Sequence, residues 1–146
     1  MKKFLLTLCA LLLLTGCGNK NLDLEKVNEN VKETNVFSNL QILSEEHMKN
    51  NFSIDAQKAE EILFVGDTEN SDADLFTDFY IVVKAKDETI LEDIDNLLSE
   101  SFEQRLEMYN PEGLQKVKNR LETTYNGYKI YISSSDNEKV LKAIKK

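Results

Sequence analysis

The dipeptide Asn126-Gly127 constrains the fold more than any other feature of this chain. It separates two segments of β-forming composition, residues 117–125 and 128–133, and both of its residues tolerate the positive φ angles that a type I′ turn requires. A two-residue turn also sets the register, which gives the hairpin one apolar side. The expected pairs are Tyr125 with Tyr128, Thr123 with Ile130, Leu121 with Ile132, and Glu122 with Tyr131.

Residues 87–109 carry the strongest helical pattern of the chain. Their apolar side chains recur at three- and four-residue steps, and Asp87 can cap the start. An amphipathic helix of this length buries its apolar side against a sheet. A further helix is expected after it, with Asn110 as the cap and Pro111 at the first helical position. The apolar positions of the long segment are Ile90, Leu91, Ile94, Leu97, Leu98, Phe102 and Leu106.

The other segments complete an α+β pattern. Residues 61–65 and 76–86 have the β-branched and aromatic content of strands, and the acidic residues 67–74 between them have the composition of a hairpin loop. After two N-terminal helices the order is β-β-α-β-β-α, which predicts an antiparallel four-stranded sheet with helices packed on one face. Flanking helices are expected over residues 24–34, after a cap at Ser44, and after a cap at Asp136. The first of them is expected to dock onto the domain; the alternative is that it lies on the membrane beside the anchor, which its mixed charge disfavours.

The first 16 residues have the form of a secretory signal. Lys2 and Lys3 precede an apolar run over residues 4–14. A run of this length is too short for a bilayer core, which needs about 20 apolar residues, and it fits a signal peptide. We therefore assign residues 1–16 to a signal peptide that is removed from the mature protein.

The signal ends in Leu14-Thr15-Gly16-Cys17, which resembles the lipobox of bacterial lipoproteins. The resemblance implies cleavage after Gly16, S-diacylglyceryl and N-acyl (palmitate-type) groups on Cys17, and a protein held on the outer, extracytoplasmic face of the cell membrane. Two acyl chains anchor a protein stably, whereas one holds it only marginally. The alternative is an ordinary secretory signal with a coincidental cysteine. The expected organisation is a signal peptide over 1–16, a lipidated cysteine and tether over 17–23, and one α+β domain over 24–146.

Charge and cysteine content exclude several classes of partner and site. The chain has 18 basic and 26 acidic residues, and removal of the leader with its two lysines leaves a formal charge of −10. This balance repels nucleic acid and anionic lipid headgroups. Cys9 lies in the leader and Cys17 is the expected lipid carrier, so the domain has no disulfide, and with His47 as its single histidine it has no usual zinc site. We expect no cofactor.

Four short strings of the sequence together resemble the DUF4358 family of lipoproteins from Clostridia and their relatives. The resemblance covers residues 23–146 and contains no catalytic signature. It implies a lipid-anchored, extracytoplasmic single domain in a family whose role is uncharacterised. The strings are Phe52-Ser53-Ile54-Asp55, Lys84-Ala85-Lys86-Asp87, Tyr109-Asn110-Pro111-Glu112 and Asn126-Gly127-Tyr128.

The acidic loop is a candidate for a calcium site. Its carboxylates offer the oxygen ligands that calcium prefers on a flexible loop. The EF-hand pattern is not met, because Asp72 stands where a glycine is needed and Asp78 where the last glutamate is needed. The alternative is a solvated hairpin loop, so no metal site is assigned. The candidate ligands are Asp67, Glu69, Asp72 and Asp74.

Three further groups of residues have a catalytic interpretation and a simpler one. Glu100, Glu103 and Glu107 lie on one helix face, but an exposed row lacks the unequal environments that glycoside hydrolysis needs. Residues 133–135 are three serines with no histidine near in sequence, which favours a turn before the Asp136 cap. The lone histidine is expected on a helix surface. No catalytic residue is assigned, and the chain is not expected to be an enzyme.

Tyr80, Lys129 and Tyr131 are candidates for an interaction face, because tyrosines with one wet end are frequent in interfaces. If the three share an uncovered sheet face, that face receives a partner protein; the alternative is that the tyrosines fill space beside the strands. The leading hypothesis is a non-enzymatic binding or accessory module for an envelope protein of unknown identity. The alternative function is a small-ligand or Ca²⁺ sensor that uses the acidic 67–74 loop.

Overall fold

A computed structural model describes residues 20–69 and 74–146 of the chain. The expected signal peptide, the expected lipidation site Cys17 and one candidate ligand of the acidic loop, Asp72, lie outside these residues. None of the helices in the described part combines the length and the hydropathy that a bilayer-spanning segment needs.

The centre of the molecule is one antiparallel sheet of five strands, in the order β1-β2-β3-β5-β4. The α+β class and the antiparallel sheet are confirmed, but the prediction of four strands is wrong. The additional strand, β1, has three residues, too few to show a period-two pattern, and it is defined by its pairing of Ile42 with Val65. The strands are β1 (Leu40–Ile42), β2 (Ala59–Asp67), β3 (Phe79–Ala85), β4 (Leu121–Tyr125) and β5 (Tyr128–Ser133).

The predicted hairpin has the predicted register. Tyr125 pairs with Tyr128, and the other three expected pairs also form. Asn126 has φ 51° and Gly127 has φ 84°, as the turn between β4 and β5 requires. The first strand is shorter than expected, because residues 117–118 still belong to the preceding helix.

Three of the predicted helix caps are present. The side chain of Ser44 accepts a hydrogen bond from the His47 N–H, and Asn110 and Asp136 each cap the helix that follows. Each of these caps depends on residues that are neighbours in sequence, so the sequence alone predicts it. The helices are α2 (Leu24–Glu33), α3 (Glu45–Phe52), the 3₁₀ turn η1 (Ala56–Lys58), α4 (Thr89–Asn96), the π segment η2 (Leu97–Phe102), α5 (Glu103–Tyr109), α6 (Pro111–Lys118) and α7 (Asn137–Ile144).

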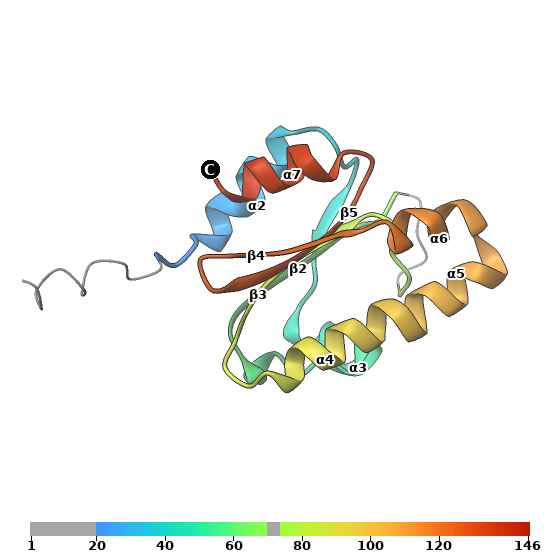
Figure 1. Cartoon of the computed structure of the whole chain (residues 1–146), viewed down its shortest axis with the longest axis horizontal. Helices are drawn as coiled ribbons and strands as arrows, with labels where there is room; N and C mark the ends of the chain where they lie inside the picture. The colour runs from blue at the N-terminus through green and yellow to red at the C-terminus, as the bar shows by residue number, and fades with distance from the viewer. Residues whose placement is uncertain (1–19, 70–73) are drawn as a thin grey trace, which may run out of the picture.

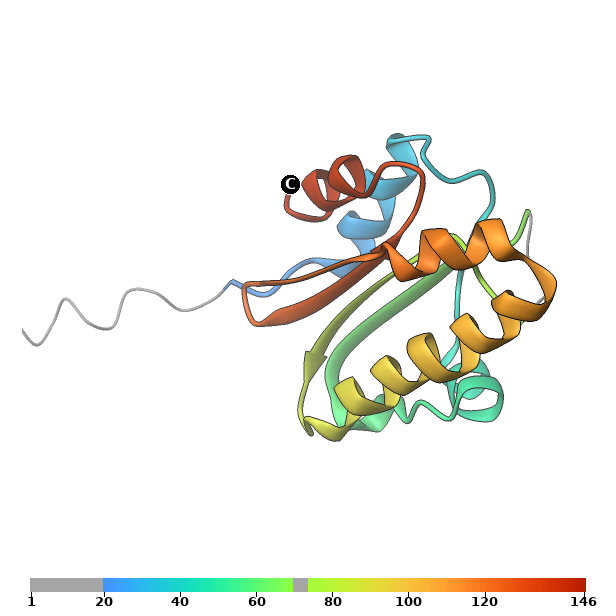
Figure 2. The same cartoon turned by 45° about the vertical axis from the view of Figure 1, so that its right-hand side comes forward.

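Helices cover both faces of the sheet, so the prediction of one covered face is wrong. Figure 1 shows α2 and α7 above the sheet and α3 with the long α4–η2–α5 helix below it, and Figure 2 confirms the three layers. On β3, Tyr80 and Val82 join the core under α2 and α7, whereas Phe79, Ile81 and Val83 join the other core. Residues 79–83 are an unbroken apolar run, which is the pattern of a strand buried on both sides.

Candidate functional site

The predicted interaction face on the sheet does not exist. Tyr80 and Tyr131 are both fully buried, and they lie on opposite faces. The Tyr80 hydroxyl donates to Asn28 Oδ1 at 2.8 Å, and the Tyr131 hydroxyl donates to Asp95 Oδ1 at 2.9 Å. Burial raises the pKa of both phenols. The two tyrosines are therefore core residues with satisfied hydroxyls.

Lys129, the third member of that predicted face, does not present a free charge either. Its Nζ lies 5.3 Å from the centre of the Tyr131 ring and 3.4 Å from Glu122 Oε2 across the hairpin. Contacts of this kind hold a partly exposed lysine on the sheet and add little stability. The reason for the wrong prediction is the second helical layer, which the order of elements did not reveal.

The described candidate ligands of the acidic loop, Asp67, Glu69 and Asp74, do not form a metal-binding cluster. The Asp67 carboxylate is buried and accepts hydrogen bonds from the backbone N–H groups of Ser38, Asn39 and Glu69, so it fixes the chain beside β1 and β2. Asp74 instead accepts a 2.6 Å hydrogen bond from Asn51 Nδ2. Across residues 20–69 and 74–146, no cluster of three or more acidic, histidine or cysteine side chains is arranged to hold a metal ion.

Addition of millimolar calcium is expected to leave the thermal unfolding midpoint unchanged, because Asp67 is committed to backbone N–H groups. A ligand at a hundred times its dissociation constant would add roughly 2.7 kcal/mol, which raises the midpoint by several degrees. The measurement is a thermal melt followed by circular dichroism, with magnesium at equal ionic strength as the control. A rise with calcium alone would restore the sensor hypothesis.

Two of the three serines and one of the three glutamates have structural partners in the described part of the chain. The buried Ser133 hydroxyl donates to the backbone oxygen of Thr77, and Ser134 donates to Asn137 at the start of α7. Glu103 forms a 2.8 Å ion pair with Arg120. These contacts connect secondary-structure elements and give no nucleophile with an adjacent base.

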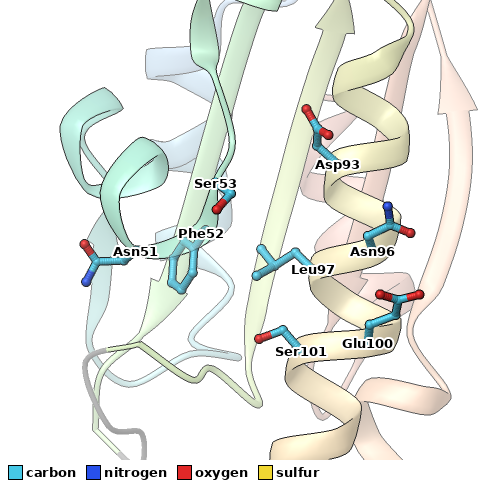
Figure 3. Close-up of a pocket in the computed structure, with 8 residues that line it drawn as sticks. All are labelled: Asn51, Phe52, Ser53, Asp93, Asn96, Leu97, Glu100 and Ser101. Atoms are coloured by element: carbon cyan, nitrogen blue, oxygen red, sulfur yellow. The ribbon is translucent and has the colours of Figure 1, made fainter.

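Glu100 is the member of the glutamate row that reaches a concave surface. It lies in an open groove of about 450 Å³ between the C-terminal end of α3 and the α4–η2 helix. Figure 3 shows the α3 residues on one side and the helix residues on the other, with Leu97 and Ser101 directed toward α3 and with Asn96 and Glu100 directed away from it, at the rim of the groove. The groove is lined by Asn51, Phe52, Ser53, Asp93, Asn96, Leu97, Glu100 and Ser101.

Two irregular backbone segments shape this groove. Helix α3 ends at Ser53, which has the left-handed φ of 57° and turns the chain into the next segment. The opposite wall contains the π segment η2, which supplies Leu97, Glu100 and Ser101. A π segment inside an α-helix is often found at a functional site.

The four-residue spacing of the core positions gives a physical reason for η2. In an α-helix each step of four residues rotates a side chain by about 40° from the previous one, so repeated steps leave the buried face. The wider π turn takes up this excess rotation and keeps the whole series in the core. The positions are Ile90, Ile94, Leu98, Phe102 and Leu106, all at most 1% exposed.

The groove is acidic and rich in hydrogen-bonding groups. Asp93 lies 2.7 Å from Lys58 Nζ, and this hydrogen bond raises the pKa of the lysine. Among the described residues Glu100 has no ion-pair partner, and no lysine or arginine lines the groove. Amides and hydroxyls surround the carboxylates, while Phe52 and Leu97 are almost fully buried beneath them. The arrangement suits a ligand that carries a positive charge on an apolar stem.

Among the residues that line this groove, Glu100 alone is a candidate for chemistry in the sequence, where a solvated helix face is the simpler expectation. Leu97 is expected in the core, and the asparagines and serines carry no sequence signal. The two walls are at least 40 residues apart in sequence, so only tertiary packing brings them together.

No family model matches the sequence, and neither the curated proteins nor the solved structures include a significant match to the chain. The groove and the motif at the chain start are therefore the basis for inferring a function.

Proposed function

We propose that this protein is a lipid-anchored lipoprotein on the extracytoplasmic face of a bacterial membrane and that its domain is a non-enzymatic binding module. The segment Leu14-Thr15-Gly16-Cys17 supports the anchor. The partner is a segment of another envelope protein that places a lysine or arginine in the groove between α3 and η2.

The groove itself is the observation that carries the binding role. Glu100 supplies a carboxylate without an ion-pair partner among the described residues, and Asn51 and Asn96 add amide groups on the two walls. A basic side chain can place its charged end at Glu100 while its methylene stem lies over Leu97. Because the groove is open, it can receive a side chain presented by an intact protein surface.

A photo-crosslinking amino acid in place of Asn96 tests this role. In native membranes it is expected to give a discrete adduct with one envelope protein. The matched control is the same amino acid in place of Glu29, which is exposed on α2 and away from the groove. The same adducts from both positions would contradict a groove-specific partner.

A charge reversal at the groove provides a second test of the binding role. Glu100→Lys is expected to lower the adduct yield about tenfold, because it replaces attraction with repulsion at the contact. Glu107→Lys makes the same change on an exposed position of the same long helix, outside the groove, and is expected to leave the yield nearly unchanged. Equal losses in both variants would indicate nonspecific electrostatic capture.

A further inference from the structure

A second depression, of about 210 Å³, lies where the described chain begins and carries an unusual concentration of lysines. Its walls are the start of α2, the tip of the β4–β5 hairpin and the end of α7, which lie together at one end of the molecule in Figures 1 and 2. One carboxylate, Asp23, is among its lining residues. The basic members, here called the lysine cluster, are Lys20, Lys26, Lys145 and Lys146.

Most of the positive charge in the lysine cluster is not neutralised by nearby acids. The Asp23 carboxylate accepts the backbone N–H of Lys26 as the cap of α2. Glu33 lies 4.0 Å from Lys146 Nζ, but both side chains are about 70% exposed, so this pair is weak. Lys145 lies over the ring of Tyr125 at 5.1 Å. In the described part of the chain Lys20 and Lys26 have no ion pair.

The lysine cluster is held close to the expected anchor. Lys20 follows Cys17 by three residues, and three residues span at most about 11 Å. The next two residues are bound to the sheet: Asn21 Oδ1 accepts from Lys84 Nζ at 3.2 Å, and the Leu22 N–H donates to the Tyr128 hydroxyl at 3.1 Å. The cluster therefore cannot move far from the lipid-bearing residue.

The hydroxyl that holds Leu22 is itself fixed in place. Tyr128 is fully buried, and its hydroxyl donates to the Glu61 carboxylate on β2. Burial and this hydrogen bond raise the pKa of Tyr128 to about 12. The neutral phenol thus accepts from the N-terminal segment and donates to the sheet at neutral pH.

We propose that the lysine cluster binds anionic phospholipid headgroups and sets the orientation of the domain on the membrane; this inference rests on the proposed lipid anchor. The cluster lies within reach of the surface, where lysines interact favourably with anionic headgroups over a Debye length of about 8 Å. The acidic balance of the whole chain does not prevent this contact, because a charge at 10 Å or less outweighs screened charges farther away. The opposite end of the molecule, at α5 and α6, then points away from the membrane (Figure 1).

The test uses the full-length lipidated protein, purified from membranes and reconstituted into two kinds of vesicle. One kind is phosphatidylcholine alone, and the other also contains phosphatidylglycerol. A fluorophore on Thr124→Cys, an exposed position beside the hairpin tip, reports quenching by headgroup-labelled lipid. A fluorophore on Gln104→Cys, at the α5 end, is the control probe. Quenching at position 124 is expected to be several-fold stronger in the anionic vesicles and to fall at high salt.

Removal of charge completes the test. The triple variant Lys26→Gln, Lys145→Gln, Lys146→Gln is expected to abolish the difference between the two vesicles at position 124. The control triple variant Lys32→Gln, Lys49→Gln, Lys118→Gln removes the same charge from exposed positions outside the cluster and is expected to retain the difference. Equal quenching in both vesicles, with the protein still bound, overturns this inference and leaves the anchor intact. Failure of the protein to stay on either vesicle overturns the anchor and this inference together.

Discussion

Replacement of Cys17 by serine is expected to abolish lipid modification and cleavage of the leader. The thioether requires the cysteine sulfur, and each buried methylene of an acyl chain contributes roughly 0.8 kcal/mol of membrane affinity. Loss of both acyl chains therefore lowers the partition coefficient of the protein into the membrane by many orders of magnitude. The intact mass of the protein from cells reports the outcome: the native protein loses residues 1–16 and gains acyl groups, and the Cys17→Ser protein does neither.

The second cysteine of the chain provides a matched control. Cys9 lies within the apolar run of the leader, so Cys9→Ser is expected to leave acylation, cleavage and membrane retention unchanged. An acylated Cys17→Ser protein, or a native protein without added mass, would refute the lipoprotein assignment. Metabolic incorporation of labelled palmitate gives an independent measure of the same modification.

Replacement of Phe102 by alanine is expected to destabilise the domain by roughly 3–5 kcal/mol. Phe102 is fully buried at the end of η2, and its ring meets the Phe52 and Phe79 rings edge-on at 5.6 and 6.0 Å between centroids. The alanine leaves a cavity that these rings cannot fill. The free energy of unfolding in urea measures the loss, and the thermal midpoint should fall by roughly 10–20 °C.

The same helix offers the control for this loss. Met108 is 72% exposed, so Met108→Ala is expected to change the free energy of unfolding by less than about 0.5 kcal/mol. Because both substitutions place alanine in one continuous helix, the difference between them isolates burial from helix propensity. Similar losses in the two variants would contradict the packing of the long helix against β3.

Local signals in the sequence predicted local structure well. The Asn126-Gly127 turn determines which residues face each other in the hairpin. The side chains of Ser44 and Asp136 each accept a hydrogen bond from the backbone N–H three residues later, and so mark the starts of two helices. These features depend on interactions between neighbours in the chain. These features can therefore be predicted from the sequence alone.

Three features that depend on distant contacts were not predicted. Strand β1 forms because Ile42 pairs with Val65, and the second helical layer forms because α2 packs on α7 from the other end of the chain. The groove has the same origin, since Ser53 and Glu100 belong to separate elements. The unbroken apolar run over residues 79–83 is the signal in the sequence for a sheet covered on both faces, and the order of elements alone does not contain it.

The hydrogen bond from Leu22 to Tyr128 also limits how far the domain can lie from the proposed anchor. With Asn21 and Leu22 held on the sheet, the proposed tether consists of the few residues between Cys17 and Asn21, which span no more than about 14 Å. A domain on so short a tether stays close to the bilayer surface and cannot reach more distant layers of the envelope. The proposed partner must then come to the membrane surface, as an integral protein or another lipoprotein does.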